Sequence, residues 1–167
     1  HVARFAVTLR WCPVRHYSGR RFSLTDIGIL AQALLSGFCD IGGRAAIESL
    51  VSRDIRVSGV EGLDIHGSAE LLRFHNMVWC QLDALSAEPA LVLRDPPWVS
   101  LVCLLTLRER RSGLGTTDRL QVTMRIDRGR VAEVIAFVDF LALFEAIGRL
   151  PPRILDRCLT GEVMRAL

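Results

Sequence analysis

The sequence predicts an α+β domain in which a strongly curved antiparallel sheet forms a cone covered by about three N-terminal helices. Helical patterns come first along the chain and long alternating segments follow, an order typical of α+β proteins. The ordered part then closes with an alternating strand, a tight turn at 127–130, a second strand and an amphipathic helix over 139–148. This closing arrangement is expected of a cone-shaped sheet that encloses an apolar pocket.

Length and composition narrow the class of protein. With 167 residues the chain is long enough for one domain whose core needs no disulfide or metal. Hydrophobic residues make up 50% of it, so we expect a large core, an apolar cavity or a subunit interface. The net charge of +3 is mild, every basic residue is Arg, and the Gly–aromatic motif of RNA-binding proteins does not occur. Nucleic acid is therefore not an expected partner.

Cysteine usage and hydropathy favour a cytoplasmic protein. The cysteines are widely spaced and are interpreted as buried free thiols of a reducing compartment: Cys12, Cys39, Cys80, Cys103 and Cys158. The longest apolar run, Trp98–Leu107, is about half as long as a membrane helix, and no signal segment is recognisable. We expect no membrane contact. Because the sequence has no phosphate-binding loop and no His/Cys cluster, we also expect no cofactor and no metal.

The chain divides into three parts. Residues 1–22 are interpreted as an Arg-rich arm, 23–150 as the folded domain, and 151–167 as a C-terminal tail with one helical turn. Helices are predicted from the cap signal at Ser23–Asp26 to about Cys39, over 44–51, and from a cap at Ser68 to about Leu82. Strands are predicted at 53–57, 90–94, 98–110, 120–126 and 131–138, with loops at 59–67 and 111–117.

Several short motifs resemble one superfamily. They are Asp54–Val57, Ile65-His66-Gly67, Met124–Val131, and Phe137–Phe140 followed by Phe144 and Gly148. Over roughly residues 26–150 their order resembles the SnoaL-like branch of the NTF2-like superfamily, which is similar to ketosteroid isomerases and limonene-epoxide-hydrolase-type enzymes. The resemblance implies a hydrophobic, polyketide- or terpenoid-like substrate and a homodimer formed through the convex face of the sheet. It does not imply one reaction, because the fold carries cyclases, isomerases, hydrolases and binding proteins.

The resemblance also shows which catalytic groups are missing. The Tyr and the two Asp residues of ketosteroid isomerases are matched by Leu35, Ser58 and Val122, which cannot do the same proton transfers. Of the epoxide-hydrolase Arg-x-Asp and second Asp, one carboxylate is kept as Glu109, while Leu107 and Ala136 stand at the other two places.

Strand parity predicts which side chains face the pocket, because alternate residues of a strand point to opposite faces of the sheet. Each of the three closing strands has one apolar row, which we assign to the concave side beneath the helices; the mixed rows then fall on the convex side. The positions predicted to line a substrate pocket are Leu34, Trp79, Leu105, Leu107, Leu120, Val122, Met124, Val134, Ala136 and Val138.

Three residues are candidates for acid–base catalysis. Glu109 ends the apolar row of the long strand, where desolvation is expected to raise its pKa; a solvated ion pair with a neighbouring Arg is the alternative. His75 lies on the inward stripe of the third helix, either as a proton-transfer group or as a buried His bonded to a backbone carbonyl. Asp64, together with His66, belongs to the Gly-bounded loop, where polar residues mostly shape turns.

Three functions are compatible with these residues. The first is a cofactor-independent cyclase or isomerase that confines a hydrophobic substrate and uses Glu109, with His75 as an auxiliary. The second is an epoxide-opening hydrolase or cyclase, in which Glu109 activates water or a hydroxyl group and His75 or Asp64 protonates the epoxide. The third is a non-catalytic module whose cavity carries or senses a ligand.

Overall fold

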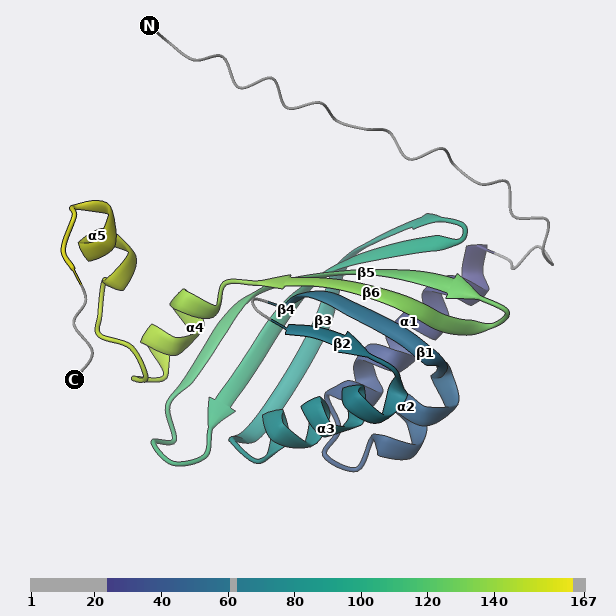
Figure 1. Ribbon diagram of the computed structural model, residues 1–167, viewed down its shortest axis with the longest axis horizontal. Helices are drawn as coiled ribbons and strands as arrows, with labels where there is room; N and C mark the ends of the chain where they lie inside the picture. Colours follow the sequence, from purple (N-terminus) through teal and green to yellow (C-terminus); the bar gives the residue numbers. More distant parts are fainter. Residues whose placement is uncertain (1–23, 61–62, 164–167) are drawn as a thin grey trace, which may run out of the picture.

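The computed structural model describes residues 24–60 and 63–163, which form an α+β domain on one curved six-stranded sheet (Figure 1). Its helices are α1 (Leu24–Phe38), α2 (Arg44–Leu50), α3 (Ser68–Trp79), α4 (Phe140–Ala146) and α5 (Ile154–Leu159). Its strands are β1 (Val51–Val60), β2 (Leu63–His66), β3 (Leu82–Asp95), β4 (Trp98–Glu109), β5 (Gly115–Asp127) and β6 (Arg130–Val138). The predicted arm, 1–22, and the cap residue Ser23 lie outside the described residues.

The sheet has the strand order β2-β1-β6-β5-β4-β3. Strands β3 to β6 form the predicted antiparallel meander, in which Val122 of β5 lies between Leu101 of β4 and Ala136 of β6. β1 runs parallel to β6, with Val57 opposite Val134, so the sheet is mixed rather than wholly antiparallel. The strands bend over α1, α2 and α3, which lie together on one side, and the predicted cone is confirmed (Figure 1).

Burial separates a concave face from a convex face. On β4 every second residue from Val99 to Glu109 is buried, and the residues between them are half-buried or exposed. The first three residues of this row, Val99, Leu101 and Cys103, pack in the main hydrophobic cluster, which also contains Ile27 and Ala31 of α1 and Ile55 of β1. A second hydrophobic cluster joins β3 and β4 to α4 and contains Leu82, Leu105, Leu107, Leu143 and Ile147. The concave assignment made from strand parity is therefore confirmed.

The helices begin close to their sequence signals. Oδ1 of Asp139 accepts a hydrogen bond from the backbone N–H of Ala142 at 2.9 Å, so Asp139, the first residue of the predicted helix 139–148, is the N-cap of α4. The N-cap of α3 is Gly67 rather than the predicted Ser68, and its φ of +86° is a conformation that favours glycine. Among the described residues, no helix is both long and apolar enough to cross a membrane.

Several strands differ in their bounds from the prediction, β2 and β3 most of all. The segment 59–67, predicted to be a loop, contains β2, which pairs with β1 through Ile65 opposite Val57. β3 starts at Leu82, where the sequence predicted the end of a helix, and runs through the exposed Pro89. Because β3 is an edge strand with a register shift just after Pro89, the missing N–H of proline is tolerated there.

Candidate functional site

The concave face becomes less buried towards the end of the molecule that carries α4. Along β5, Ile126, Met124 and Val122 are buried, whereas Leu120 and Asp118 are only partly buried. All five residues belong to the same inward-facing row, so the change reflects an opening of the cone and not a change of strand face.

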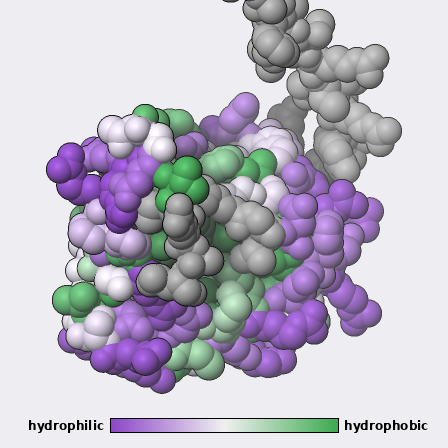
Figure 2. Space-filling view, turned by 60° about the vertical axis from the view of Figure 1, so that its left-hand side comes forward, coloured by the Kyte–Doolittle hydropathy of each residue, from purple (hydrophilic) through white to green (hydrophobic). Residues whose placement is uncertain are grey.

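The neighbouring strands show the same opening. On β6, Val134 is buried while Ala136 and Val138 are half-buried. Ala87 of β3 and Leu120 of β5 pack against both hydrophobic clusters, so the two clusters meet at this place. Figure 2 shows this end of the molecule, where separate apolar patches lie between hydrophilic surface on both sides. Inward-facing apolar surface that remains partly exposed is suited to a hydrophobic ligand.

Asp118 is a polar group at the opening and is not among the site residues predicted from the sequence. It lies on the concave face of β5, directly opposite Leu105 of β4. Its Oδ1 accepts a hydrogen bond from the N–H of Arg119 at 2.7 Å, whereas its Oδ2 is buried and has no partner among the described residues. A buried carboxylate oxygen without a donor is costly, so it is a ready acceptor for a polar group of a ligand. Asp118 is two residues before Leu120, so strand parity puts both on the same face; the predicted strand 120–126 starts too late to include Asp118.

His75 of α3 is 1% exposed and links this helix to the end of α1. Its Nε2 lies 3.0 Å from the backbone oxygen of Asp40, and since a carbonyl only accepts, Nε2 is the donor. In the neutral ring Nδ1 is then an acceptor; it is buried and has no partner among the described residues. The bond to a carbonyl matches one of the two interpretations of His75, and the free Nδ1 keeps the proton-transfer interpretation open.

Trp79 strengthens the same link. Its Nε1 donates to the backbone oxygen of Phe38 at 3.0 Å, and its ring meets that of His75 edge-on with centroids 6.4 Å apart. Trp79 therefore satisfies a carbonyl group at the C-terminal end of α1. The Asp40 carbonyl that His75 contacts also accepts a hydrogen bond from the backbone N–H of Gly43 at 2.9 Å. Together with Phe38 and Phe74, Trp79 and His75 form an aromatic wall between α1 and α3.

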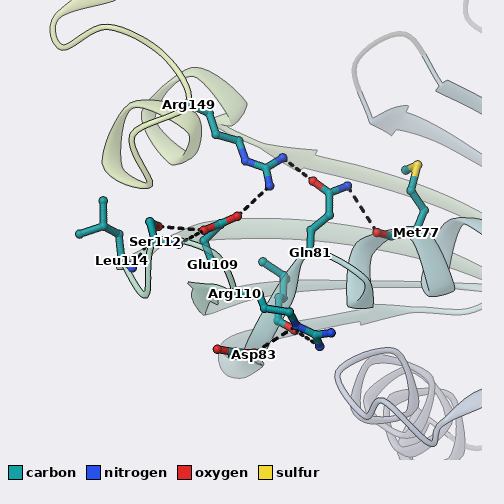
Figure 3. Close-up of polar contacts among 9 residues, drawn as sticks. Met77, Gln81, Asp83, Glu109, Arg110, Ser112, Leu114 and Arg149 are labelled. Carbon is teal, nitrogen blue, oxygen red and sulfur yellow. Dashed lines mark hydrogen bonds and ion pairs between the residues drawn. The ribbon is translucent and has the colours of Figure 1, made fainter.

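Glu109 is 3% exposed, but its carboxylate is bound within the protein (Figure 3). Its Oε2 accepts hydrogen bonds from the backbone N–H of Ser112 at 2.6 Å and from the Ser112 hydroxyl at 2.8 Å, and its Oε1 accepts one from Arg149 at 3.0 Å. The two bonds from Ser112, helped by Arg149, outweigh burial and lower the pKa of Glu109 to about 2. The expected rise of this pKa is therefore wrong, while the acid–base role of Glu109 stays a prediction.

Asp64 and His66 lie on β2 rather than in a loop, and both are exposed. The backbone N–H of His66 donates to Glu70 of α3 at 2.7 Å, so this motif ties the strand to the helix. Within residues 24–60 and 63–163, no hydrogen bond joins Asp64, His75 and Glu109 to one another. The catalytic role of Asp64 also stays a prediction.

The predicted lining residues lie on the inward side of the cone. Those that are buried are Leu34, Trp79, Leu105, Leu107, Val122, Met124 and Val134, and those that are half-buried are Leu120, Ala136 and Val138. The half-buried residues border the opening, whereas the buried ones, apart from Trp79, belong to the hydrophobic clusters. That any of them binds a substrate stays a prediction.

Of the described cysteines, all expected to be buried, Cys103 is buried, Cys39 is half-buried, and Cys80 and Cys158 are exposed, so the expectation is wrong for the last two. Burial raises the pKa of the Cys39 thiol to about 11 and also raises the pKa of Cys103, so neither is suited to be a nucleophile. No group of three or more His, Cys, Asp or Glu side chains that could hold a metal ion occurs in residues 24–60 and 63–163.

Comparison with known proteins identifies the fold. No family model and no curated protein matches the sequence. A protein of Jannaschia sp. CCS1, provisionally named as a SnoaL-like polyketide cyclase, superposes with a TM-score of 0.70 at 19% identity, over 80% of this chain and 100% of that one. An LEH-like epoxide hydrolase of M. tuberculosis has a TM-score of 0.63 at 13% identity, over 82% and 97% of the two chains. A Catenulispora acidiphila protein with a ketosteroid isomerase-like fold, in complex with trimethylamine, has a TM-score of 0.66 at 8% identity, over 71% and 92%.

The chain therefore has the α+β cone fold of NTF2-like proteins, which it shares with SnoaL-like, ketosteroid isomerase-like and LEH-like structures. The resemblance seen in the sequence motifs is confirmed at the level of the fold. Because one fold carries many activities, the reaction has to be argued from the site itself.

Proposed function

We propose that the protein is a cofactor-independent cyclase or isomerase that holds a hydrophobic, polyketide- or terpenoid-like molecule at the open end of the cone. The observation that carries this proposal is Asp118, whose buried Oδ2 has no partner among the described residues on an otherwise apolar part of the concave face. The apolar walls supply affinity, and the carboxylate orients the bound molecule. His75, whose buried Nδ1 has no partner among the described residues, keeps the auxiliary role predicted for it.

Ring closure at such a site needs one proton acceptor and a confined substrate. Asp118 takes the α-proton beside a substrate carbonyl, and the electron pair of that C–H bond forms an enolate. The enolate carbon attacks a second carbonyl carbon of the same molecule, a C–C bond forms, and the resulting alkoxide takes the proton back from Asp118. Isomerisation shares the first step and returns the proton to another carbon.

The contacts of Glu109 do not support the epoxide-opening alternative in its expected form. That reaction needs two acid–base groups that converge on one place. Glu109 bonds Ser112 and Arg149, and among the described residues it has no hydrogen bond to His75 or Asp64. We therefore keep ring closure or isomerisation as the proposal, with Asp118 rather than Glu109 as the acid–base group.

The test is the exchange of α-protons with solvent deuterium in a fused-ring β-keto ester, followed by proton NMR. Asp118→Asn is expected to slow the protein-catalysed exchange about 10²–10⁴-fold, because an amide cannot take the proton. Asp54→Asn is the matched control, since Asp54 is an exposed aspartate on β1, and it should exchange at the rate of the unaltered protein.

Three outcomes decide between the candidates. An unchanged rate in Asp118→Asn contradicts the proposal. An equal loss in Glu109→Gln alone gives the acid–base role to Glu109. If the unaltered protein binds the ester without exchanging its α-protons, it is a binding module for such molecules and not a catalyst.

We also propose that two copies of the chain pair through the convex face of the sheet. Four large apolar side chains of this face are exposed: Leu91 at 48%, Leu93 at 58%, Leu104 at 46% and Phe137 at 56%. Leu91 lies opposite Val102 and Phe137 lies opposite Gln121, on the rows that face away from the helices. A second copy can cover this surface with the same surface of its own, as in two-fold symmetric dimers.

A further inference from the structure

Segment 139–163 follows β6 at the open end of the cone, where α4 contacts β5 and α5 packs against α4 (Figure 1). Leu143 and Ile147, on one side of α4, are buried in the second hydrophobic cluster with Leu105 and Leu107 of the concave face. Leu120, next to Asp118 on the inward row of β5, packs against the same cluster. α4 therefore covers the concave surface that adjoins the candidate site, as its position at the end of the sheet indicates (Figure 1).

One side chain makes the polar contacts that hold this segment to the rest of the described molecule. Arg149 donates from Nη2 to Oε1 of Glu109 at 3.0 Å and from Nη1 to Oε1 of Gln81. The other side-chain hydrogen bonds of 139–163 stay within the segment, such as those of Asp139 and Glu145. Apart from Arg149, the segment is held by the continuity of the chain and by apolar packing.

The two acceptors of Arg149, Glu109 and Gln81, are also fixed by hydrogen bonds to other groups (Figure 3). Ser112 binds Oε2 of Glu109 twice, which leaves Oε1 directed at the guanidinium. Nε2 of Gln81 lies 3.4 Å from the backbone oxygen of Met77, and this contact orients its Oε1. The Glu109 side chain is 4% exposed and that of Arg149 is 37% exposed, so a half-exposed cation is bound to a fixed, buried anion.

The contacts of α4 allow it to move as one unit. Asp139 caps its first turn, directly after the end of β6. Its last turn is closed by bonds from the backbone N–H groups of Arg149 and Leu150 to the oxygen of Phe144, with Gly148 at a φ of +75°. The backbone groups at both ends of α4 thus find partners without a hydrogen bond to the sheet. The helix can therefore leave the sheet without losing its own hydrogen bonds.

We infer that residues 139–163 form a lid over the open end of the cone and that Arg149 is its latch. When Arg149 leaves Glu109 and Gln81, the segment turns about the junction at Asp139 and uncovers the concave surface beside Leu105. Glu109 is then a positioning residue that acts through Arg149. The inference goes beyond the proposed reaction, because it concerns access to the interior for any molecule that enters.

Access can be measured without a substrate through Cys103. This thiol is 1% exposed and lies on the concave row of β4, two positions from Leu105. Its labelling by N-ethylmaleimide under native conditions, resolved by peptide mass spectrometry, reports how often the interior opens. In Arg149→Met, which keeps an apolar stem, labelling of Cys103 is expected to be about ten- to a hundred-fold faster, as for loss of a charge-assisted hydrogen bond.

Arg153→Met is the matched control. The Arg153 side chain is 81% exposed and its ion pair is with Asp156 of the same segment, so this variant should label at the rate of the unaltered protein. Gln81→Met removes the other acceptor of Arg149 and is expected to speed labelling as well, by a smaller factor. If Arg149→Met does not fold, Gln81→Met decides in its place.

Hydrogen exchange separates opening of the lid from loss of global stability. The inference predicts faster amide exchange in 139–163 of Arg149→Met, with β1 and β5 as protected as before. It is overturned if Cys103 labelling does not change in Arg149→Met, if Arg153→Met accelerates it equally, or if β1 and β5 lose protection together with the segment. None of these readouts depends on Asp118 or on turnover, so the lid and the proposed reaction can fail independently.

Discussion

Glu109 stands at the end of an apolar row, and the strand pattern alone makes burial the main expected influence on its pKa. The turn after β4 places Ser112 against the carboxylate, and Arg149 reaches it from 40 residues further along the chain. The sequence predicts that Glu109 is buried, because burial follows from parity. It does not predict these donors, because they depend on how a turn and a distant segment meet.

The lowered pKa of Glu109 leads to a prediction about stability. The folded-state pKa, about 2, lies below the ordinary value of 4.5, so the carboxylate stabilises the fold above pH 4.5 and this contribution is lost as the pH falls towards 2. Glu109→Gln has no charge to lose at this position. The difference in free energy of unfolding between the two proteins, measured by urea denaturation, should be constant near neutral pH and shrink below pH 4.5. If the difference in free energy of unfolding were the same near neutral pH and near pH 2, the lowered pKa of Glu109 would be contradicted.

For Asp118, the face of the sheet can be predicted from the sequence, but the surroundings of its carboxylate cannot. Its face was predictable, because it is on the same parity row as Leu120 and Val122. It was missed because residues 111–117 have loop composition and the predicted strand began only at Leu120, whereas β5 begins at Gly115. That its Oδ2 lacks a partner among the described residues is a property of the packed structure, and no local pattern contains it.

At the level of elements, those with a local signal were predicted and those defined by pairing were not. α1, α2 and the Asp139 cap of α4 follow from helical periodicity and capping chemistry. β2 has only four residues and becomes a strand by pairing with β1, so alternation within it is too short to recognise. The first half of β3 is not predicted, because Pro89 indicates a break in the strand. β3 nevertheless continues through Pro89, since it is an edge strand and an edge strand tolerates proline.

The sheet as an element carries the prediction about assembly. Leu104 lies on the convex face opposite Arg119 of β5, so Leu104→Arg adds a second positive charge to the proposed interface. If copies pair there, this variant should dissociate at a concentration at least about ten-fold higher than the unaltered protein, as expected for a charge placed among apolar contacts. Light scattering coupled to size-exclusion chromatography measures the molar mass.

Leu159→Arg is the control for this experiment, because Leu159 is a leucine of α5 that is 77% exposed and lies off the sheet. The convex face is not the interface if Leu104→Arg keeps the mass of a dimer, or if Leu159→Arg lowers it equally.

For the whole molecule, the rows of alternating residues determine the cone more strongly than any single motif does. Three strands with one apolar face each have to bury those faces together, and the preceding helices are the elements available to cover them. The parallel pairing of β1 with β6 was not predictable in the same way, because parity fixes the face of a strand but not its neighbour. The contact of segment 139–163 with Glu109 likewise appears only once the chain is folded.

The most direct measurement of the central claim is methyl NMR on protein labelled at Leu and Val, titrated with a dihydroxyanthraquinone as a hydrophobic, hydroxylated probe. If the open end of the cone is the binding site, saturable shifts should appear at Leu105, Leu120 and Val138, and Asp118→Asn should weaken the binding about ten-fold or more. Saturable shifts at Leu91 and Leu93 of the convex face instead, or no saturable shift inside the cone, would contradict the account.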